Sequence, residues 1–274
     1  MSLHLRELLM RELGALRHEP IDKRIRATIG DETVIDTTAA LLVWEPKRVV
    51  PSYAIPDADI AAEIAAGPGA SVASLCDADV PQLLGRPVLD PSVPFSVHTT
   101  DGEPVTVRAH GREAAGFRAA DPEIGGHVIL AFEGFDAWYE EDERNVSHPR
   151  DPFHRIDIVH SSRHVRVDVE GETLAESSRP YLLFETGLPV RYYLPPEDVR
   201  VDRLASRPTG TACAYKGQAS YWALDGRDVA WYYPQPLREA AEITDRVAFF
   251  NERVDIVVDG ERLDRPVTPW SVDL

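Results

Sequence analysis

The chain of 274 residues has few cysteines, no long apolar run and no excess of positive charge. Its two cysteines, Cys76 and Cys213, are too few for a disulfide framework or a four-cysteine zinc site. No uninterrupted apolar stretch approaches the roughly 20 residues that a membrane-spanning helix needs. Residues 1–17 carry acidic and basic side chains throughout, unlike a secretory signal. We therefore expect a cytoplasmic protein without a membrane partner.

Positive charge is the scarcest property of the composition. The sequence has 29 Lys and Arg residues against 46 Asp and Glu residues, which gives a formal net charge of −17. Such a charge opposes binding to the phosphate backbone of nucleic acids, so we expect no nucleic-acid partner. Local groups of basic side chains could still hold a small anionic molecule.

Two parts of the chain resemble each other. Residues 171–274 align with residues 30–153, and Leu-Val-Trp-Glu at 42–45 falls on Leu-Leu-Phe-Glu at 182–185. This self-similarity predicts two tandem domains of related fold.

The two copies differ most at one short motif. The second copy has Cys-Ala-Tyr-Lys-Gly at residues 213–217, where our alignment gives the first copy His-Thr-Thr-Asp-Gly at 98–102. A duplicated turn needs its glycine in both copies. A thiol, a phenol and an amine that occur in one copy alone indicate a single working site in the second repeat, with the first repeat as a scaffold or an interface.

Secondary-structure patterns favour strands. Alternating apolar residues at 25–29 and 165–169, followed by glycine turns, predict antiparallel strands, and short strands of the same kind continue along the chain. We also expect short helices over residues 57–66, 71–84 and 243–252.

The N-terminus and the junction complete the predicted organisation. Leucines at helical spacing between residues 2 and 16 predict an amphipathic helix, which could dock on a domain or form a homo-oligomer. The predicted parts are an N-terminal helix over residues 1–18, a first repeat over 19–145 and a second repeat over 150–274.

Several ordered motifs carry a family resemblance. They are Phe-Glu-Thr-Gly at 184–187, Arg-Tyr-Tyr-Leu-Pro at 191–195, the motif at 213–217 and Phe-Phe-Asn-Glu-Arg-Val at 249–254. With His-Pro-Arg-Asp-Pro-Phe at 148–153 as connector, the chain resembles two-repeat members of the domain-of-unknown-function 427 family. The resemblance implies a mainly β chain: two tandem small β-tent (Mss4-like) domains of antiparallel strands with short helices.

Two features depart from what the family suggests. The family pattern normally has proline where this chain has Ala214, and the loss of a fixed φ could loosen the turn. The family has also been labelled a nucleotidyltransferase group, but the sequence has no glycine-rich phosphate loop and no paired aspartates after a strand.

Cys213, Tyr215 and Lys216 are the candidate catalytic residues, with Glu185 as a fourth. A lysine near a thiol favours the thiolate, and a phenol can orient or protonate a substrate oxygen. Glu185 follows three apolar residues, so we expect partial burial to raise its pKa and suit it to general acid–base work. The alternative is a buried cysteine, a packed tyrosine, a solvated lysine and a structural glutamate, since Glu45 aligns with Glu185.

The candidate ligand-binding residues are cationic, aromatic or amide side chains of the second repeat: Arg191, Tyr193, Tyr221, Trp231 and Asn251. Arg191 aligns with Pro51, and it could pair with Glu185 or clamp a carboxylate or phosphate. The aromatic residues could form the wall of a pocket or simply pack in the core. Asn251 could cap the predicted helix or face the Lys216 cluster.

Histidines at 148, 154, 160 and 164 raise the question of a metal site. On a strand, His160 and His164 would lie about 13 Å apart, too far to chelate one ion. We therefore expect no metal and no other cofactor.

Together these patterns favour an enzyme that acts on a small anionic metabolite in one pocket of the second repeat, through cysteine, tyrosine and lysine chemistry. The reaction is not assigned. The alternatives are a non-catalytic small-ligand-binding module and a structural or assembly protein.

Overall fold

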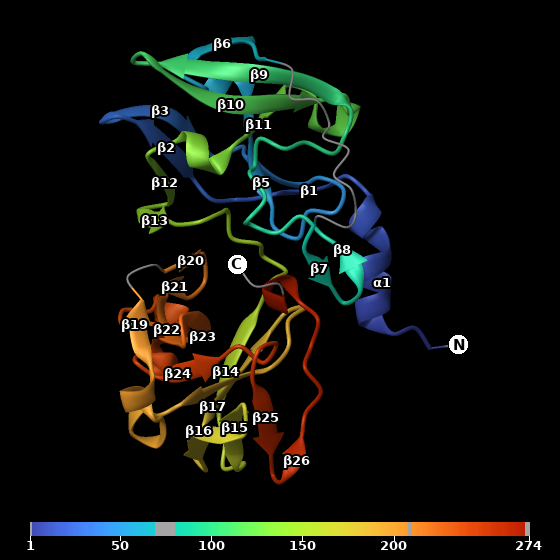
Figure 1. Ribbon diagram of the computed structural model, residues 1–274. Helices are drawn as coiled ribbons and strands as arrows, with labels where there is room; N and C mark the ends of the chain where they lie inside the picture. The colour runs from blue at the N-terminus through green and yellow to red at the C-terminus, as the bar shows by residue number, and fades with distance from the viewer. Residues whose placement is uncertain (1, 69–79, 208–209, 272–274) are drawn as a thin grey trace. The chain divides into compact units, whose positions relative to one another are not determined.

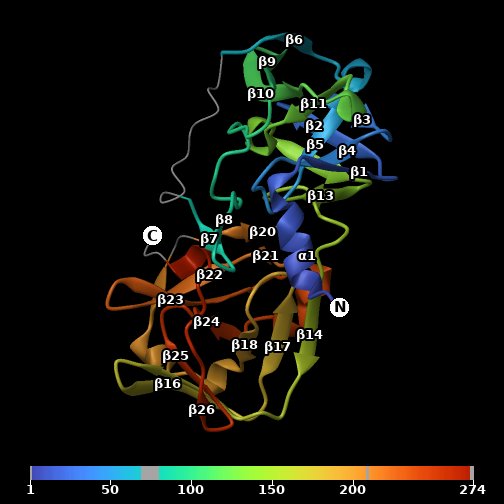
Figure 2. The same ribbon diagram turned by 90° about the vertical axis from the view of Figure 1, so that its right-hand side faces the viewer.

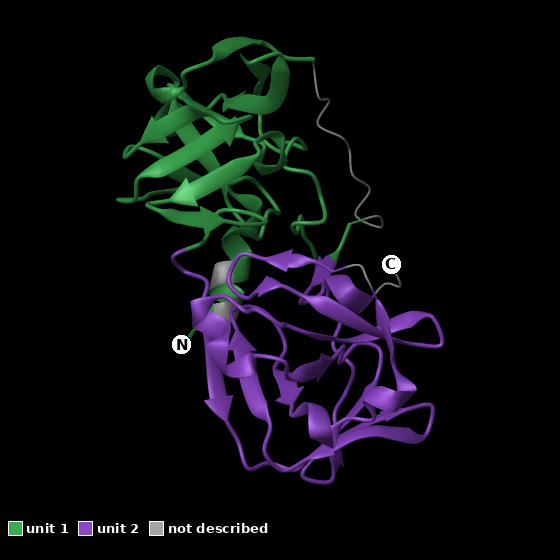
Figure 3. Cartoon of the chain, turned by 90° about the vertical axis from the view of Figure 1, so that its left-hand side faces the viewer, with its two compact units in different colours: residues 1–81, 87–151 green, residues 82–86, 152–274 purple. Residues whose placement is uncertain are grey.

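The computed structural model describes residues 2–68, 80–207 and 210–271, and within them the fold is mainly β (Figure 1). The chain divides into two compact units (Figure 3). Unit 1 comprises residues 1–81 and 87–151, and unit 2 comprises residues 82–86 and 152–274. None of the described helices is long and apolar enough to span a membrane.

Unit 1 is built from two antiparallel sheets. The seven-stranded sheet has the order β1 (Arg17–Pro20), β4 (Leu41–Trp44), β5 (Ser52–Pro56), β11 (His127–Leu130), β10 (Arg112–Ala119), β9 (Gly102–Ala109), β6 (Glu63–Ala66). The four-stranded sheet has the order β13 (Glu143–Asn145), β12 (Ala137–Glu140), β2 (Ile25–Ile29), β3 (Glu32–Thr37). Alternate residues of β2 are buried in one apolar core with residues of the seven-stranded sheet, as strand geometry requires.

Unit 2 has a sheet pair of the same sizes. Its seven-stranded sheet has the order β14 (Ile156–His160), β17 (Tyr181–Glu185), β18 (Arg191–Leu194), β24 (Val247–Phe249), β23 (Arg227–Tyr232), β22 (Ser220–Leu224), β19 (Ala205–Arg207). Its four-stranded sheet has the order β16 (Glu172–Ser177), β15 (Val165–Val169), β25 (Asp255–Val258), β26 (Glu261–Arg262). Figure 2 shows β14, β17 and β18 side by side.

Two short hairpins lie outside these sheets. One is β7 (Gln82–Leu83) with β8 (Arg86–Pro87), and the other is β20 (Ala212–Cys213) with β21 (Gly217–Gln218).

The strand order is the same in both units. Each large-sheet and small-sheet strand of unit 2 has a label thirteen higher than the strand in the corresponding place of unit 1. The ladders fix the register, because Val43 pairs with Ser52 in unit 1 and Leu183 pairs with Arg191 in unit 2. Arg191 therefore takes the strand position of Ser52, one residue away from the Pro51 of the sequence alignment.

The seven-stranded sheet of unit 2 has apolar residues on both faces. On β18, Tyr192 packs in the core shared with the four-stranded sheet, whereas Tyr193 packs in a second cluster with Leu183 and Trp231. Neighbouring residues of a strand point to opposite faces, which explains the division. The second cluster lies beside the candidate functional residues.

The N-terminal helix is shorter than the sequence predicted. Helix α1 covers Leu5–Arg11 and is followed by a 3-10 turn at Glu12–Gly14. Leu13 is buried, but Leu5 is 65% exposed, so the predicted apolar stripe does not form one buried face. A helix of about two turns gains little from propensity alone and depends on what packs against it.

Two further predicted helices are wrong. Residues 57–66 form a 3-10 turn and then β6, and residues 243–252 contain β24. β6 pairs with β9, and β24 lies between β18 and β23, so pairing within the sheet overrides local helix preference. Most of the helix predicted over 71–84 and Cys76 lie outside the described residues.

Tyr53 provides a test of the unit 1 core. Its hydroxyl donates to Glu140 Oε1 at 2.7 Å and accepts from Asn145 Nδ2 at 3.0 Å. We expect Tyr53→Phe to lower the free energy of unfolding by about 1–3 kcal/mol, because buried Glu140 loses a donor. Tyr192→Phe, at the corresponding position of β18, is the control. Urea denaturation that shows equal losses for the two variants would contradict this assignment.

Candidate functional site

The motif at residues 213–217 forms the hairpin of β20 and β21, in which Cys213 pairs with Gly217. Gly217 has a φ of +95°, a conformation that favours glycine. A Cβ atom there would lie 3.3 Å from the Gln235 carbonyl oxygen, so backbone packing also favours glycine. Ala214, in the place of the family's proline, is fully buried. Packing around Ala214 and Gly217 therefore holds the hairpin, although the proline is absent.

Glu185, the last residue of β17, contacts two side chains from different parts of unit 2. Lys216 Nζ donates to Glu185 Oε2 at 2.5 Å, and His154 Nε2 lies 3.1 Å from Glu185 Oε1. The side chains of Lys216 and Glu185 are only 10% and 7% exposed, whereas that of His154 is 20% exposed. The structure thus brings together Lys216 and Glu185, two of the four candidate catalytic residues.

The electrostatics of this pair correct the expectation for Glu185. Burial raises the pKa of Glu185, but the positive charge of Lys216 and the hydrogen bond with His154 outweigh burial and lower the pKa to about 2. Burial lowers the pKa of Lys216, but the nearby Glu185 and Cys213 charges raise it above its ordinary value. Glu185 is therefore ionised at neutral pH, and the raised pKa that we predicted is wrong.

Cys213 and Tyr215 lie beside this ion pair. The Cys213 thiol is half-buried and close enough for its charge to act on the pKa values of Lys216 and Tyr233. The Tyr215 ring is buried and stacks on His154, with ring centroids 4.5 Å apart. All four residues predicted as catalytic thus belong to one neighbourhood.

His154 is the member of this neighbourhood that sequence reasoning missed. It was considered only as a metal ligand, and it directly follows the connector motif at 148–153. That proximity to a recognised motif was the one available signal. Its contact with Glu185 joins residues 31 positions apart, which no local pattern reveals.

Arg191 pairs with Glu252 instead of Glu185. Its two Nη atoms donate to the two carboxylate oxygens at 2.8 and 2.7 Å, and both side chains are buried. The guanidinium also lies over the rings of Trp231 and Trp270, 5.3 and 5.4 Å from their centroids. Burial raises the pKa of Glu252, but Arg191 outweighs burial and lowers it.

The predicted aromatic residues divide between packing and hydrogen bonding. Tyr193 is fully buried and its hydroxyl accepts from Trp231 Nε1 at 3.0 Å. Burial raises the pKa of Tyr193, and the charges of both Lys216 and Arg191 oppose that rise. Tyr193 is therefore close enough to both ion pairs for their charges to act on it. Tyr221 shares a hydrogen bond of 2.7 Å with the Thr211 hydroxyl.

Asn251 does not cap a helix, because the segment before it is β24. Its side-chain Nδ2 donates to the Val190 carbonyl at 2.9 Å. Asn251 and Glu252 thus contact two consecutive residues, Val190 and Arg191. This places Asn251 beside the Arg191 ion pair.

Unit 1 keeps the carboxylate but gives it other partners. Phe117 pairs with Pro104 in unit 1, and Trp231 pairs with Tyr221 at the corresponding place in unit 2. Counting back along the chain from Pro104 and from Tyr221 places Lys216 where unit 1 has Thr99. Our sequence alignment had placed Lys216 on Asp101. In unit 1, Glu45 accepts from the Thr99 backbone N–H at 2.7 Å.

A histidine completes the arrangement in unit 1. His98 Nδ1 lies 2.8 Å from Glu45 Oε1, and its ring stacks on Phe117 at 4.1 Å. Both units therefore use the corresponding carboxylate to anchor the segment before β9 or β22, and among the described residues the amine and the thiol occur there in unit 2.

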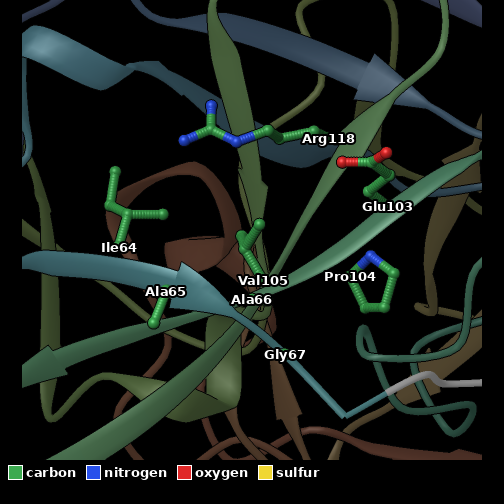
Figure 4. Close-up of a pocket in the computed structure, with 8 residues that line it drawn as sticks. All are labelled: Ile64, Ala65, Ala66, Gly67, Glu103, Pro104, Val105 and Arg118. Atoms are coloured by element: carbon green, nitrogen blue, oxygen red, sulfur yellow. The ribbon is translucent and has the colours of Figure 1, made fainter.

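Surface hollows also occur in unit 1, and two of them are lined by other residues. One of about 390 Å³ lies over the ends of β6, β9 and β10, with Arg118 and Glu103 in its lining (Figure 4). The Arg118 guanidinium pairs with Asp57 there. The other, of about 330 Å³, lies at the β9–β10 turn. Neither hollow contains a predicted site residue.

Within residues 2–68, 80–207 and 210–271, no group of three or more His, Cys, Asp or Glu side chains has the arrangement of a metal site.

The pH dependence of stability tests the Glu185 environment. Because its pKa falls from 4.5 to about 2 on folding, Glu185 stabilises the folded protein fully above pH 4.5, and this contribution is lost as the pH falls through about 2. We expect Glu185→Gln to lower the free energy of unfolding by about 3–5 kcal/mol at neutral pH. The difference from wild type should narrow toward acid pH.

Urea denaturation of both proteins at a series of pH values measures this difference. Glu176→Gln is the control, because Glu176 contacts His164 at 2.8 Å on the exposed surface. A difference for Glu185→Gln that stays constant across the acid range would contradict the lowered pKa.

Comparison with known proteins agrees with the resemblance noted in the sequence. Residues 157–260 match the family model described as a domain of unknown function (DUF427). The matched segment includes Glu185, Arg191, Cys213, Lys216 and Glu252, and it begins three residues after His154. No curated protein matches the chain. Residues 157–260, the greater part of unit 2, therefore belong to the domain-of-unknown-function 427 family.

Proposed function

We propose that unit 2 is an enzyme acting on a small anionic molecule, with Cys213 as nucleophile or redox centre. One observation carries the proposal: a thiol, an ammonium group, a carboxylate and an imidazole converge beside the hairpin of β20 and β21. In the described part of unit 1, the corresponding carboxylate contacts an imidazole and a backbone N–H in place of a thiol and an amine.

Lys216 supplies positive charge to the reacting atoms in this proposal. An ammonium group has three N–H donors, and Glu185 accepts from one of them. The others are available to the Cys213 thiolate and to an anionic oxygen of the substrate. A lysine held in this way favours the thiolate, which is the reactive form of cysteine.

Glu185 acts as an orienting group in this scheme, because a carboxylate with a pKa of about 2 is a weak base at neutral pH. It accepts a hydrogen bond from His154 Nε2–H, which leaves Nδ1 of the neutral ring as an acceptor. His154 then transfers the proton, and the stacked Tyr215 ring fixes its plane. Arg191, already paired with Glu252, supports the sheet beside the site.

The architecture completes the proposal. The identical strand order supports a tandem duplication, with each unit a small β-tent domain and unit 1 a scaffold or an interface. A working thiol needs a reducing compartment, and the cytoplasm provides one. Leu3 and Leu5 are exposed at the N-terminus and would be the residues through which the chain forms a homo-oligomer.

A non-catalytic ligand-binding module is the second candidate. The observation that favours it is the mutual neutralisation of Lys216 and Glu185, which gives both side chains a structural role without a reaction. In that case Cys213 is a packing residue, and its thiol is inert.

Alkylation of Cys213 distinguishes the two candidates. In a Cys76→Ser background, we expect iodoacetamide at neutral pH to modify Cys213 about tenfold faster than an unfolded control peptide, because Lys216 favours the thiolate. Lys216→Met should remove most of this advantage, whereas Lys216→Arg, which keeps the charge, should retain part of it. Mass spectrometry follows the modification.

Circular dichroism of each variant verifies that it is folded. A Cys213 thiol that reacts more slowly than the peptide in the folded wild-type chain would reject the enzyme and favour the binding module.

A further inference from the structure

The last described segment of the chain covers the Arg191–Glu252 ion pair. We call residues 266–271 the C-terminal strap. Thr268 Oγ1 donates to Glu252 Oε1 at 2.6 Å, and the Trp270 ring lies over the Arg191 guanidinium. Arg253 Nε donates to the Trp270 carbonyl at 3.3 Å. The strap thus contacts the ion pair through one aromatic ring and one hydroxyl donor.

These two groups act together. The Trp270 backbone N–H donates to Thr268 Oγ1 at 3.2 Å, so the hydroxyl and the indole ring are held in one turn. The strap is otherwise at the surface, since Val267 is 60% exposed and Ser271 is also exposed. Ordering this exposed segment costs conformational entropy, and its release in exchange for another ligand would recover that entropy.

The surface beneath the strap has the features of a binding site for a planar molecule. The Arg191 guanidinium lies over the rings of both Trp231 and Trp270, so removal of Trp270 would leave the guanidinium open to another aromatic ring. Glu252 would lose the donor that Thr268 supplies. Within the described part of the chain, no donor reaches the buried Asn251 Oδ1. Glu252 Oε1 and Asn251 Oδ1 could then each accept a hydrogen bond from a ligand.

We propose that Thr268 and Trp270 occupy a binding site for a planar aromatic compound that carries a hydroxyl or N–H donor. Such a compound would stack on Arg191, donate to Glu252 and displace the C-terminal strap. The charge of Glu252 disfavours an anion at this position, because Arg191 is already paired with that carboxylate. This ligand class differs from the anionic substrate of Cys213, and the proposal does not depend on the thiol chemistry.

The described strands of unit 1 carry other residues at the positions of this site. Ser52 takes the strand position of Arg191, and Phe117 takes that of Trp231.

Calorimetric titration of the full-length chain with tryptophol tests the proposal, because this compound combines an indole ring with a hydroxyl group. We expect Thr268→Val to bind tryptophol about fivefold more tightly than wild type, since Glu252 has lost its internal donor. Thr268→Ser keeps the hydroxyl and should bind as wild type does. The matched ligand 3-ethylindole lacks the hydroxyl and should gain less from Thr268→Val.

Hydrogen–deuterium exchange reports on the strap itself. We expect tryptophol to speed exchange of the amides of Thr268, Trp270 and Ser271 in the wild-type chain, because binding releases the strap. Trp270→Ala serves as a second variant if Thr268→Val does not fold, and it should bind tryptophol more tightly than wild type. Cys213→Ser should bind it as wild type does, which separates this site from the thiol chemistry.

Absence of tryptophol binding to wild type and to the folded variants would overturn the proposal. Binding that leaves strap exchange unchanged, or that is equally tight in wild type and Thr268→Val, would overturn it as well.

Discussion

The buried ion pair between Glu185 and Lys216 is the interaction on which the arrangement of unit 2 depends. Two charges removed from water are stable only when each meets its partner at short range, and here Nζ and Oε2 are 2.5 Å apart. This requirement fixes the hairpin of β20 and β21 against the end of β17. It also places Cys213 beside a cation and gives His154 a permanent carboxylate partner. Gly217 permits the turn that makes the contact.

The second ion pair, between Arg191 and Glu252, has a different relation to its surroundings. Both of its charges are also buried, but the C-terminal strap, which is not a strand, contacts this pair. Burial raises the pKa of Tyr193, and the cations of both pairs oppose that rise. Tyr193 packs in one cluster with Trp231 and Phe250, and the Trp231 ring also contacts Arg191.

Comparison of the two units shows how one fold carries different side-chain chemistry. Glu45 and Glu185 both anchor the segment that precedes a central strand, but Glu45 does so through a backbone N–H and His98. A backbone donor brings no charge and no reactive atom. The lysine in unit 2 brings a positive charge, which is why the proposed chemistry is placed there. The chemistry proposed for unit 2 therefore depends on which side chain pairs with Glu185, the counterpart of Glu45.

Sequence patterns predicted the parts of this structure that depend on local periodicity. The alternation at 165–169 predicted β15, and the matched motifs predicted the family. The helix predicted over 243–252 is wrong, because this segment contains β24, which pairs with β18 and β23. Local sequence preference does not reveal pairing with distant strands. The pKa shift of Glu185 was predicted in the wrong direction. The apolar residues before Glu185 indicated its burial, but the sequence did not indicate that Lys216 lies beside it. The partner of Arg191 and the contact of Trp270 were missed, since both depend on residues distant along the chain.

A double-mutant cycle with Glu185→Gln and Lys216→Met tests the central claim most directly, with the free energy of unfolding as the readout. If the two side chains form a mutually dependent buried pair, the loss in the double variant will be smaller than the sum of the single losses by at least about 1 kcal/mol, because the first substitution already removes the interaction. Losses that add within about 0.5 kcal/mol would show that the two residues act independently, and would contradict the account.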